Sequence, residues 1–265
     1  MKKKKIKQYL EKRMTDIEKY AAIILSVGDE EAIHQLRVGV KKLRAFLRLA
    51  GQEPSIKKKL QVHSKLKKIY KYAGRVRDLQ IYDHNIVPFF NKAERYPRKV
   101  LPQIAGAKYS LFKAIRNFHF QKSITHLKKK APDRISKETL GKFIHKKNKT
   151  IDRLVTTKIQ DAELHSLKKH LKDVTYSLKS FHATVQNYLP IAGKADTHEL
   201  DKLSDMLGEY LDYAVGLTLL NTALSGKLSK HDKAILERIK KSWTNKKARA
   251  RRRALVMLRV NKIPF

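Results

Sequence analysis

Cations recur at helical spacing along one segment of the sequence, at His34, Arg37, Lys41, Arg44 and Arg48. An α-helix would place these side chains within an arc of about 80° and spread them over about 21 Å, at roughly 1.5 Å per residue. We call this set the basic stripe. A row of that length can face several negative charges in series, whereas a single small anion would contact only part of it. The basic stripe therefore predicts a polyanionic ligand.

The basic stripe could instead be an ordinary solvated helix face, because Lys and Arg are good helix formers whose stems cover apolar surface. Two observations favour binding over that interpretation. The Arg and Lys residues of the stripe have no acidic residue four positions away that would neutralise them, and the pattern of the stripe recurs later in the chain.

His34 and its later counterpart His165 raise the question of metal or phosphoryl chemistry. Neither has another histidine or a carboxylate three or four residues further on, as a helical metal site requires. We therefore expect no metal site and no catalytic residue at these positions. Two roles stay open for both histidines, a hydrogen bond to phosphate or structural packing between helices.

Composition limits the classes of function. The 265 residues include 61 Lys and Arg against 24 Asp and Glu, a formal net charge of +37. Such a charge favours a polyanion, which can be nucleic acid, an acidic membrane surface or inorganic polyphosphate. Cysteine is absent, which excludes disulfides and is typical of a reducing cytoplasm. No stretch approaches about 18 apolar residues, so no membrane insertion is expected.

Known catalytic and cofactor motifs are absent from the sequence. It contains neither the glycine-rich cradles that bind nucleotides nor the nucleophile elbow of hydrolases. A nucleotide cradle and a hydrolase nucleophile are therefore not supported, and we expect no cofactor.

Long segments of helical periodicity alternate with short breaks that contain Gly, Pro, Asp or Ser. They predict helices at 5–27, 30–50, 54–92, 97–129, 134–158, 160–188, 195–225 and 229–261, with Gly74 as a point where the third could break. The alternation typical of β-strands is absent. We predict an all-α fold.

The two halves of the sequence share a pattern. The cations and apolar residues from His34 to Lys41 reappear 131 residues later, from His165 to Lys172. A second correspondence has a shift of 134 residues, and it relates Gly74 and Asp78 to Gly208 and Asp212. Two similar shifts in the same order predict an internal duplication. We expect two four-helix bundles related by pseudo-two-fold symmetry, at 1–130 and 131–265.

Charge changes sign between the repeats along one helical face, where Lys67, Lys71 and Arg75 correspond to Asp201, Asp205 and Glu209. Either the two faces pair across the pseudo-two-fold axis, which we favour slightly, or the acidic row confines polyanion binding to the first repeat. Asp78 and Asp212 are expected to pair with neighbouring cations and fix their rotamers. The cations of 246–253 spread around their helix and form a less specific basic surface.

The repeated histidine-bearing motifs, together with Gly74-x-x-Arg77-Asp78, make the whole chain resemble the CHAD family, the conserved histidine α-helical domain. The resemblance implies two four-helix bundles whose basic face binds inorganic polyphosphate without catalysis. It carries a binding role over to His34, Arg37, Lys41, Arg44, Lys68 and Arg77 in the first repeat and to His165, Lys168, Lys172 and Lys202 in the second. The second repeat has Thr175 and Leu211 where the first has Arg44 and Arg77, so we expect it to contribute less.

These observations together predict noncovalent binding of inorganic polyphosphate along a basic groove, to which the basic stripe also assigns Arg48. A nucleic-acid-binding protein is the alternative, although the motif segments do not interleave aromatic and basic residues as RNA-binding modules do. The absence of cysteine favours a cytoplasmic location. The resemblance adds an association with polyphosphate granules, where members of the family often lie.

Overall fold

The computed structural model describes residues 1–91, 96–156, 159–181 and 197–260. Its helices are α1 (Lys3–Val27), α2 (Glu30–Ala50), α3 (Ser64–Ile86), the 3-10 turn η1 (Val87–Phe89), α4 (Tyr96–Arg116), α5 (Phe120–Lys130), α6 (Lys137–Thr156), α7 (Asp161–Ser180), α8 (Thr197–Leu224) and α9 (Lys230–Val260). The described residues contain no β-strand, so the predicted all-α class is confirmed.

Three predicted helices differ from those observed. The predicted helix 160–188 ends at Ser180 as α7, with Phe181 at its C-cap, and 182–188 lies outside the described residues. The predicted helix 54–92 begins at Ser64 rather than at residue 54, because 51–63 runs as a loop whose buried Glu53 side chain accepts a hydrogen bond from the backbone N–H of Ser136. The predicted helix 97–129 is divided into α4 and α5. Phe118 within this break and Phe120 at the start of α5 are buried and meet edge to face at 4.7 Å between ring centroids. Gly74 does not interrupt α3.

Local signals set the boundary between α1 and α2. Gly28 adopts a left-handed conformation with φ of 64°, and its backbone N–H donates to Ile24 at the end of α1. Asp29 then caps α2, because its carboxylate accepts the backbone N–H of Ala32 at 2.5 Å. This tight turn makes α1 and α2 antiparallel neighbours.

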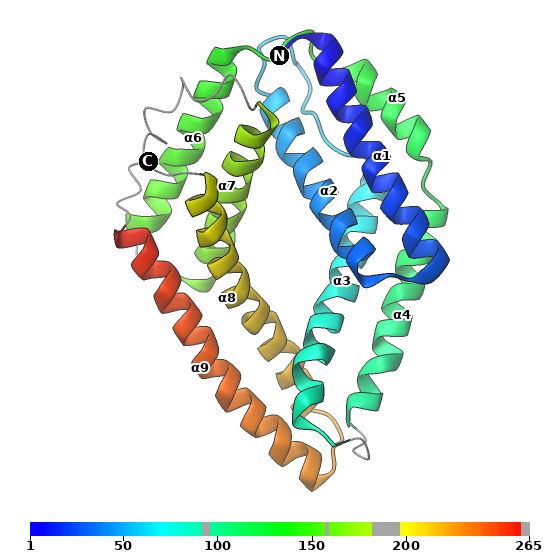
Figure 1. Cartoon of the computed structure of the whole chain (residues 1–265), viewed down its shortest axis with the longest axis vertical. Helices are drawn as coiled ribbons and strands as arrows, with labels where there is room; N and C mark the ends of the chain where they lie inside the picture. The colour runs from blue at the N-terminus through cyan, green and yellow to red at the C-terminus, as the bar shows by residue number, and fades with distance from the viewer. Residues whose placement is uncertain (92–95, 157–158, 182–196, 261–265) are drawn as a thin grey trace.

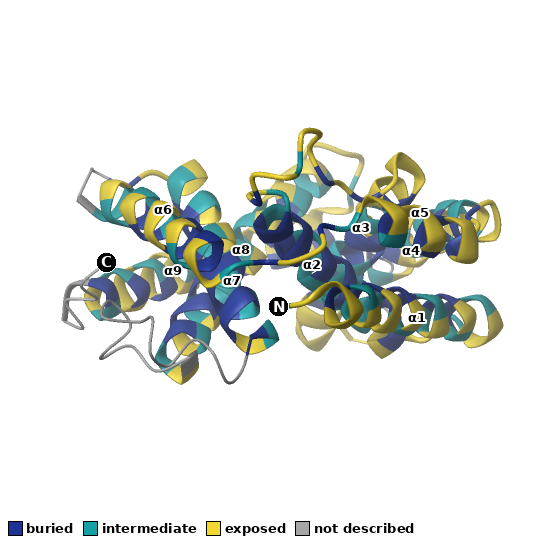
Figure 2. Ribbon diagram, turned by 90° about the horizontal axis from the view of Figure 1, so that it is seen from above, coloured by how far each residue is buried: buried dark blue, intermediate teal, exposed yellow. Residues whose placement is uncertain are grey.

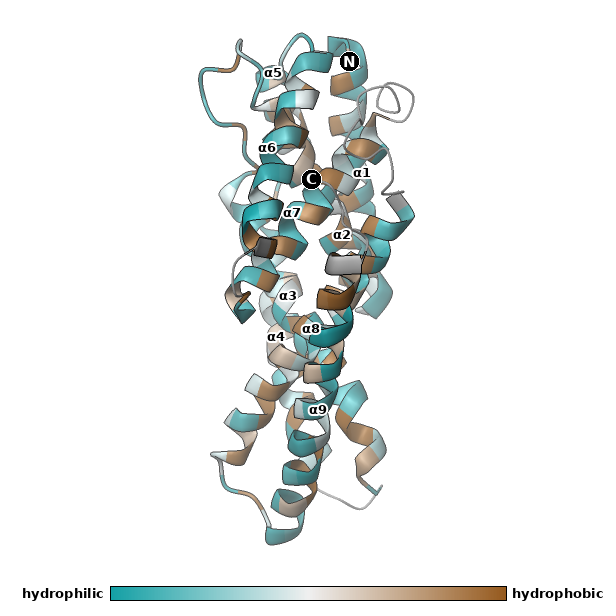
Figure 3. Cartoon of the chain, turned by 90° about the vertical axis from the view of Figure 1, so that its left-hand side faces the viewer, coloured by the Kyte–Doolittle hydropathy of each residue, from teal (hydrophilic) through white to brown (hydrophobic). Residues whose placement is uncertain are grey.

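The helices form two halves that are inclined to one another, so that the ribbon outlines a lozenge (Figure 1). One half contains α1 to α5 and the other α6 to α9, with α2 packed on α7 and α3 packed on α8. Seen from above, buried residues concentrate along the inward faces of the helices (Figure 2). Hydrophilic residues cover much of the side formed by α6 and α9 (Figure 3). Over the described residues, no helix combines the length and apolar character needed to cross a bilayer.

Two apolar clusters join the halves. The larger contains buried side chains from helices of both halves, for example Leu36 of α2 and Leu171 of α7. The smaller lies at the lower end of the view in Figure 1 and brings Tyr82 of α3 against Trp243 of α9, whose rings meet edge to face at 5.9 Å. Because both clusters draw on both predicted repeats, the repeats share their hydrophobic cores.

A buried carboxylate connects three helices between the halves. Asp173 of α7 is 2% exposed, and it accepts hydrogen bonds from Arg48 Nε of α2 at 3.0 Å and from Lys147 Nζ of α6 at 2.8 Å. A second nitrogen of Arg48 contacts the other carboxylate oxygen, so the guanidinium binds in bidentate fashion.

Replacing Asp173 with Asn should destabilise the protein by about 3 kcal/mol, because it leaves two partly buried cations without their carboxylate. The free energy of unfolding in urea measures this effect. The matched control is Asp205→Asn, since the side chain of Asp205 is 78% exposed and lies 3.6 Å from Lys172. That variant should change stability by less than about 0.5 kcal/mol. Equal losses in the two variants would contradict a special role for the buried carboxylate.

Candidate functional site

The apolar face of α2 fixes the direction of the basic stripe. Buried residues at helical spacing, from Ile33 to Leu47, hold this face against the core. The five stripe residues lie along its border and are all of intermediate exposure. Their side chains are therefore positioned by packing at the border of the core.

The guanidinium of Arg37 in the stripe packs directly over Gly74 of α3. A side-chain carbon added at Gly74 would collide with Arg37 Nη1. The ring of Tyr70, one turn earlier in α3, lies 5.3 Å from the guanidinium carbon of Arg37 and 5.3 Å from that of Arg44. Tyr70 thus holds two arginines by cation–π contact. Its role was not predicted, because nothing in its local sequence distinguishes it from an ordinary half-buried tyrosine.

The second half has a corresponding contact. Lys168 of α7 approaches Gly208 of α8 so closely that a side-chain carbon at Gly208 would lie 3.0 Å from Lys168 Nζ. Arg37 with Gly74 and Lys168 with Gly208 are pairs that the sequence pattern had aligned. The duplication itself stays a prediction from the sequence.

Cations of the two halves meet between α2 and α7. Burial, followed by the nearby charges of Arg37 and Lys168, lowers the pKa of Lys41 to about 8. Burial also lowers the pKa of Lys168, with the charge of Lys172 acting in the same direction and that of Asp212 opposing it. Each half therefore lies within the electrostatic field of the other.

His34 lies in the same field. Burial lowers its pKa, Glu31 opposes that shift, and the charges of Arg77 and Lys41 lower the pKa further. The imidazole is therefore neutral near pH 7 and can donate a hydrogen bond without adding charge. Its counterpart His165 is exposed and precedes Lys168 by one helical turn.

Several of the predicted site residues form an unneutralised group. In the described part of the chain, no carboxylate lies at ion-pair distance from His34, Arg37, Lys41, Arg44, Arg77 or Lys168. We call these residues the central cation cluster. They come from α2, α3 and α7, and an anion placed among them would face positive charge from three helices.

Other predicted site residues are engaged elsewhere. Arg48 is bound to Asp173, as described above. Lys172 pairs with Asp201 at 3.0 Å and with Asp205 at 3.6 Å. The charge of each is therefore largely neutralised before any ligand binds.

Lys68 and Lys202 are not brought to the central cation cluster. Lys68 follows the far side of α3, because the nine positions that separate it from Arg77 turn a helix through about 180°, and its Nζ lies 5.8 Å from the ring of Tyr72. Lys202 lines a separate hollow of about 520 Å³ with Arg252 and Arg253.

The acidic row of α8 is neutralised within the second half. Lys179 Nζ donates to Asp201 at 2.5 Å, and Arg253 donates to both carboxylate oxygens of Glu209 at 2.8 and 2.7 Å. The slightly favoured interpretation, in which this row pairs with first-repeat cations, is therefore wrong. The C-terminal basic residues also have local partners, since Lys247 pairs with Asp161 at 2.7 Å and Arg251 donates to the carbonyl of Ile159 at 2.5 Å.

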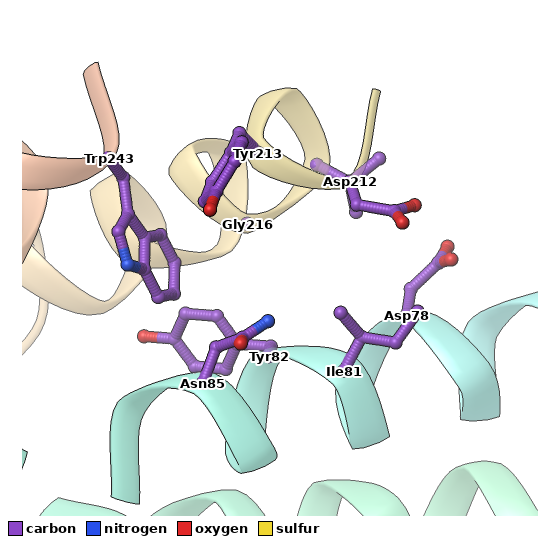
Figure 4. Close-up of a pocket in the computed structure, with 9 residues that line it drawn as sticks. Asp78, Ile81, Tyr82, Asn85, Asp212, Tyr213, Gly216 and Trp243 are labelled. Atoms are coloured by element: carbon purple, nitrogen blue, oxygen red, sulfur yellow. The ribbon is translucent and has the colours of Figure 1, made fainter. Parts of the chain in front are cut away.

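Asp78 and Asp212 lie at the lower end of the central cation cluster. Their carboxylates point toward one another from α3 and α8, beside a cavity of about 10 Å³ that Tyr82 and Trp243 also line (Figure 4). Neither carboxylate forms an ion pair in the described part of the chain, contrary to the prediction that each would pair with a cation. The described residues also contain no group of three or more His, Cys, Asp or Glu that could hold a metal ion.

Comparison with known proteins agrees with this architecture. A family model described as the CHAD domain matches residues 8–221. The crystal structure of the CHAD domain from the plant Ricinus communis has the same fold, with a TM-score of 0.75 over 98% of this chain and 90% of that chain at 16% sequence identity. No curated protein sequence is detectably similar. Since the family model covers most of its length, the chain belongs to the CHAD domain family.

Proposed function

We propose that this protein binds inorganic polyphosphate noncovalently, with the polymer lying along the central cation cluster. The observation that carries the proposal is the convergence of cations from α2, α3 and α7 that have no carboxylate at ion-pair distance among the described residues. Grouped like charges repel one another, so a bound polyanion relieves a cost that the free protein bears.

The side chains of the cluster suit phosphate in complementary ways. Arg37, Arg44 and Arg77 can each place two parallel N–H donors on phosphate oxygens, whereas Lys41 and Lys168 act as point charges. Neutral His34 can donate one further hydrogen bond. A longer polymer contacts more of these groups at once, so affinity increases with chain length and falls steeply with added salt.

Membership of the CHAD family supports polyphosphate as the polyanion, because this family is associated with polyphosphate binding. We extend the proposal to a cytoplasmic protein that associates with polyphosphate granules and has no catalytic activity of its own. Nucleic acid fits the cluster less well, because single-strand recognition uses aromatic faces for base stacking. The ring of Tyr70 is already in contact with two guanidinium groups.

A competition titration tests the choice of ligand. Long-chain polyphosphate should displace DNA and RNA of equal total charge at about 0.15 M salt, close to physiological ionic strength. The polymer recovered from the complex should keep its length. Tighter binding of either nucleic acid would overturn the proposal, and shortening of the polymer would show catalysis.

Reversing the charge of Arg37 and Lys41 to Glu should weaken polyphosphate binding by about 30-fold or more, because each substitution removes an attraction and adds a repulsion. The matched control reverses Lys57 and Lys58, which are exposed in the loop between α2 and α3. This control changes net charge by the same amount, so it should lose only a small part of the affinity. Similar losses in both variants would mean that total charge, rather than the cluster, binds the polymer.

The pH dependence of binding tests Lys41. With a pKa lowered to about 8, Lys41 is charged below that pH and neutral above it, so polyphosphate affinity should fall between pH 7 and pH 9. A loss of about threefold to tenfold is expected, since one unit of pKa coupling corresponds to tenfold in affinity. Lys41→Arg stays charged throughout this range and should flatten the profile. If the pH profile of this variant matched that of the wild-type protein, the charge of Lys41 would not contribute to binding.

A further inference from the structure

Asp78 and Asp212 occupy matching places in the two halves. Each follows, by four residues, the glycine that accommodates a cation, Gly74 for Arg37 and Gly208 for Lys168. Figure 4 shows the two carboxylates directed toward one another across the space between α3 and α8. Each carboxylate therefore lies one helical turn beyond the glycine that contacts Arg37 or Lys168.

The next turn of both helices belongs to an apolar seam. Tyr82 of α3 is 3% exposed, and Gly216 of α8 lies so close to Trp243 that an added side-chain carbon would come within 2.9 Å of its ring. Asp78 and Asp212 thus stand at the boundary between the central cation cluster and this seam. A polymer that follows the cluster toward the seam meets two negative charges there.

The surroundings of Asp78 are mainly positive but give it no direct partner. It lies within the field of Arg37 and Lys41 from α2 and of Arg75 from α3. Burial nevertheless raises its pKa, against the effect of these cations. Burial therefore makes the ionised form of Asp78 less favourable than it would be in water.

Asp212 is in a similar position. It lies within the field of Lys168 from α7, of Arg77 and Asp78 from α3, and of Lys41 from α2. Burial of its carboxyl group raises the pKa of Asp212, and the charge of Lys168 opposes this rise. The residue as a whole still has part of its surface open to solvent.

A carboxylate that served stability would be expected to form direct ion pairs, as Asp173 does with Arg48 and Lys147. Asp78 and Asp212 form none with the described residues, yet they share their cations with the proposed ligand. We propose that Asp78 and Asp212 limit the affinity of the central cation cluster for polyphosphate, because they compete with its phosphates for the same cations, and that their protonation removes this limit. The inference rests on the proposed function and adds a means of regulating it.

The test is an isosteric double variant, Asp78→Asn with Asp212→Asn, titrated with long-chain sodium polyphosphate. At pH 7.5 it should bind about threefold to tenfold more tightly than the wild-type protein, as expected for removing two like charges near the ligand. The ratio of the two affinities should shrink toward one as the solution is made acidic, because the wild-type carboxyls, whose pKa burial raises, then take up protons. Both proteins contain His34, so the effect of its protonation on affinity largely cancels in this ratio.

The matched control removes two exposed carboxylates far from the cluster, with Asp133→Asn and Glu138→Gln, whose partners are Lys3 and Lys142. It changes net charge equally and should leave affinity nearly unchanged. Should the double variant fail to fold, Asp212→Asn alone should give a gain of the same sign, since Asp212 is exposed.

Equal or weaker binding by the variant, in a wild-type background that does bind polyphosphate, would overturn the inference and leave the proposed function intact. A wild-type protein that binds no polyphosphate would instead overturn the proposed function. A gain in the control as large as that in the variant would also overturn the inference, since it would trace the effect to net charge alone.

Discussion

The buried carboxylate of Asp173 is the charged contact that joins α2 to α6 and α7. Without it, the guanidinium of Arg48 and the ammonium of Lys147 would face each other between the halves with no counter-charge. With it, two helices that carry rows of like charge are held in contact near their C-terminal ends. The neighbouring cations, Lys41 and Lys168, are then brought within each other's field. The ion pairs of Asp173 at one end of the molecule and the apolar cluster of Tyr82 and Trp243 at the other thus offset the repulsion between Lys41 and Lys168.

The glycines of α3 and α8 show the same conflict between stability and site geometry. Glycine inside a helix costs about 1 kcal/mol relative to alanine. At Gly74 an alanine would displace the tip of Arg37, and at Gly208 it would crowd Lys168. Departures from local helix preference concentrate at functional sites in proteins. The positions of these two glycines are therefore further support for the central cation cluster as the place where the chain acts.

Helical periodicity predicted most of the fold, because apolar residues repeat along nearly every helix. It failed at 54–63, where the composition suits a helix but the loop is held by the buried side chains of Leu60 and Val62 and by the bond between Glu53 and Ser136. Spacing within one segment does not reveal a partner that lies 83 residues away.

The placement of the candidate site residues was also predictable only in part. The reason is again that spacing within one segment does not show distant partners. Periodicity placed Arg37, Lys41 and Arg44 together correctly on one face of α2. It could not distinguish them from Arg48, whose partner Asp173 lies 125 residues further along the chain. Transferring motif positions also assigned Lys68 to the site, although nine residues from Arg77 correspond to the opposite face of a helix.

The two halves contribute unequal numbers of residues to the central cation cluster, and the packing explains why. Thr175, which replaces Arg44, is fully buried and donates to the carbonyl of Leu171 at 3.0 Å, so an arginine has no room there. Lys172, which corresponds to Lys41, is held by the acidic row of α8. Lys168 is then the one cation that the second half adds to the described central cluster. This asymmetry agrees with the interpretation in which the acidic row confines polyanion binding to the first repeat, and it gives the second half a structural role in setting the position of α2.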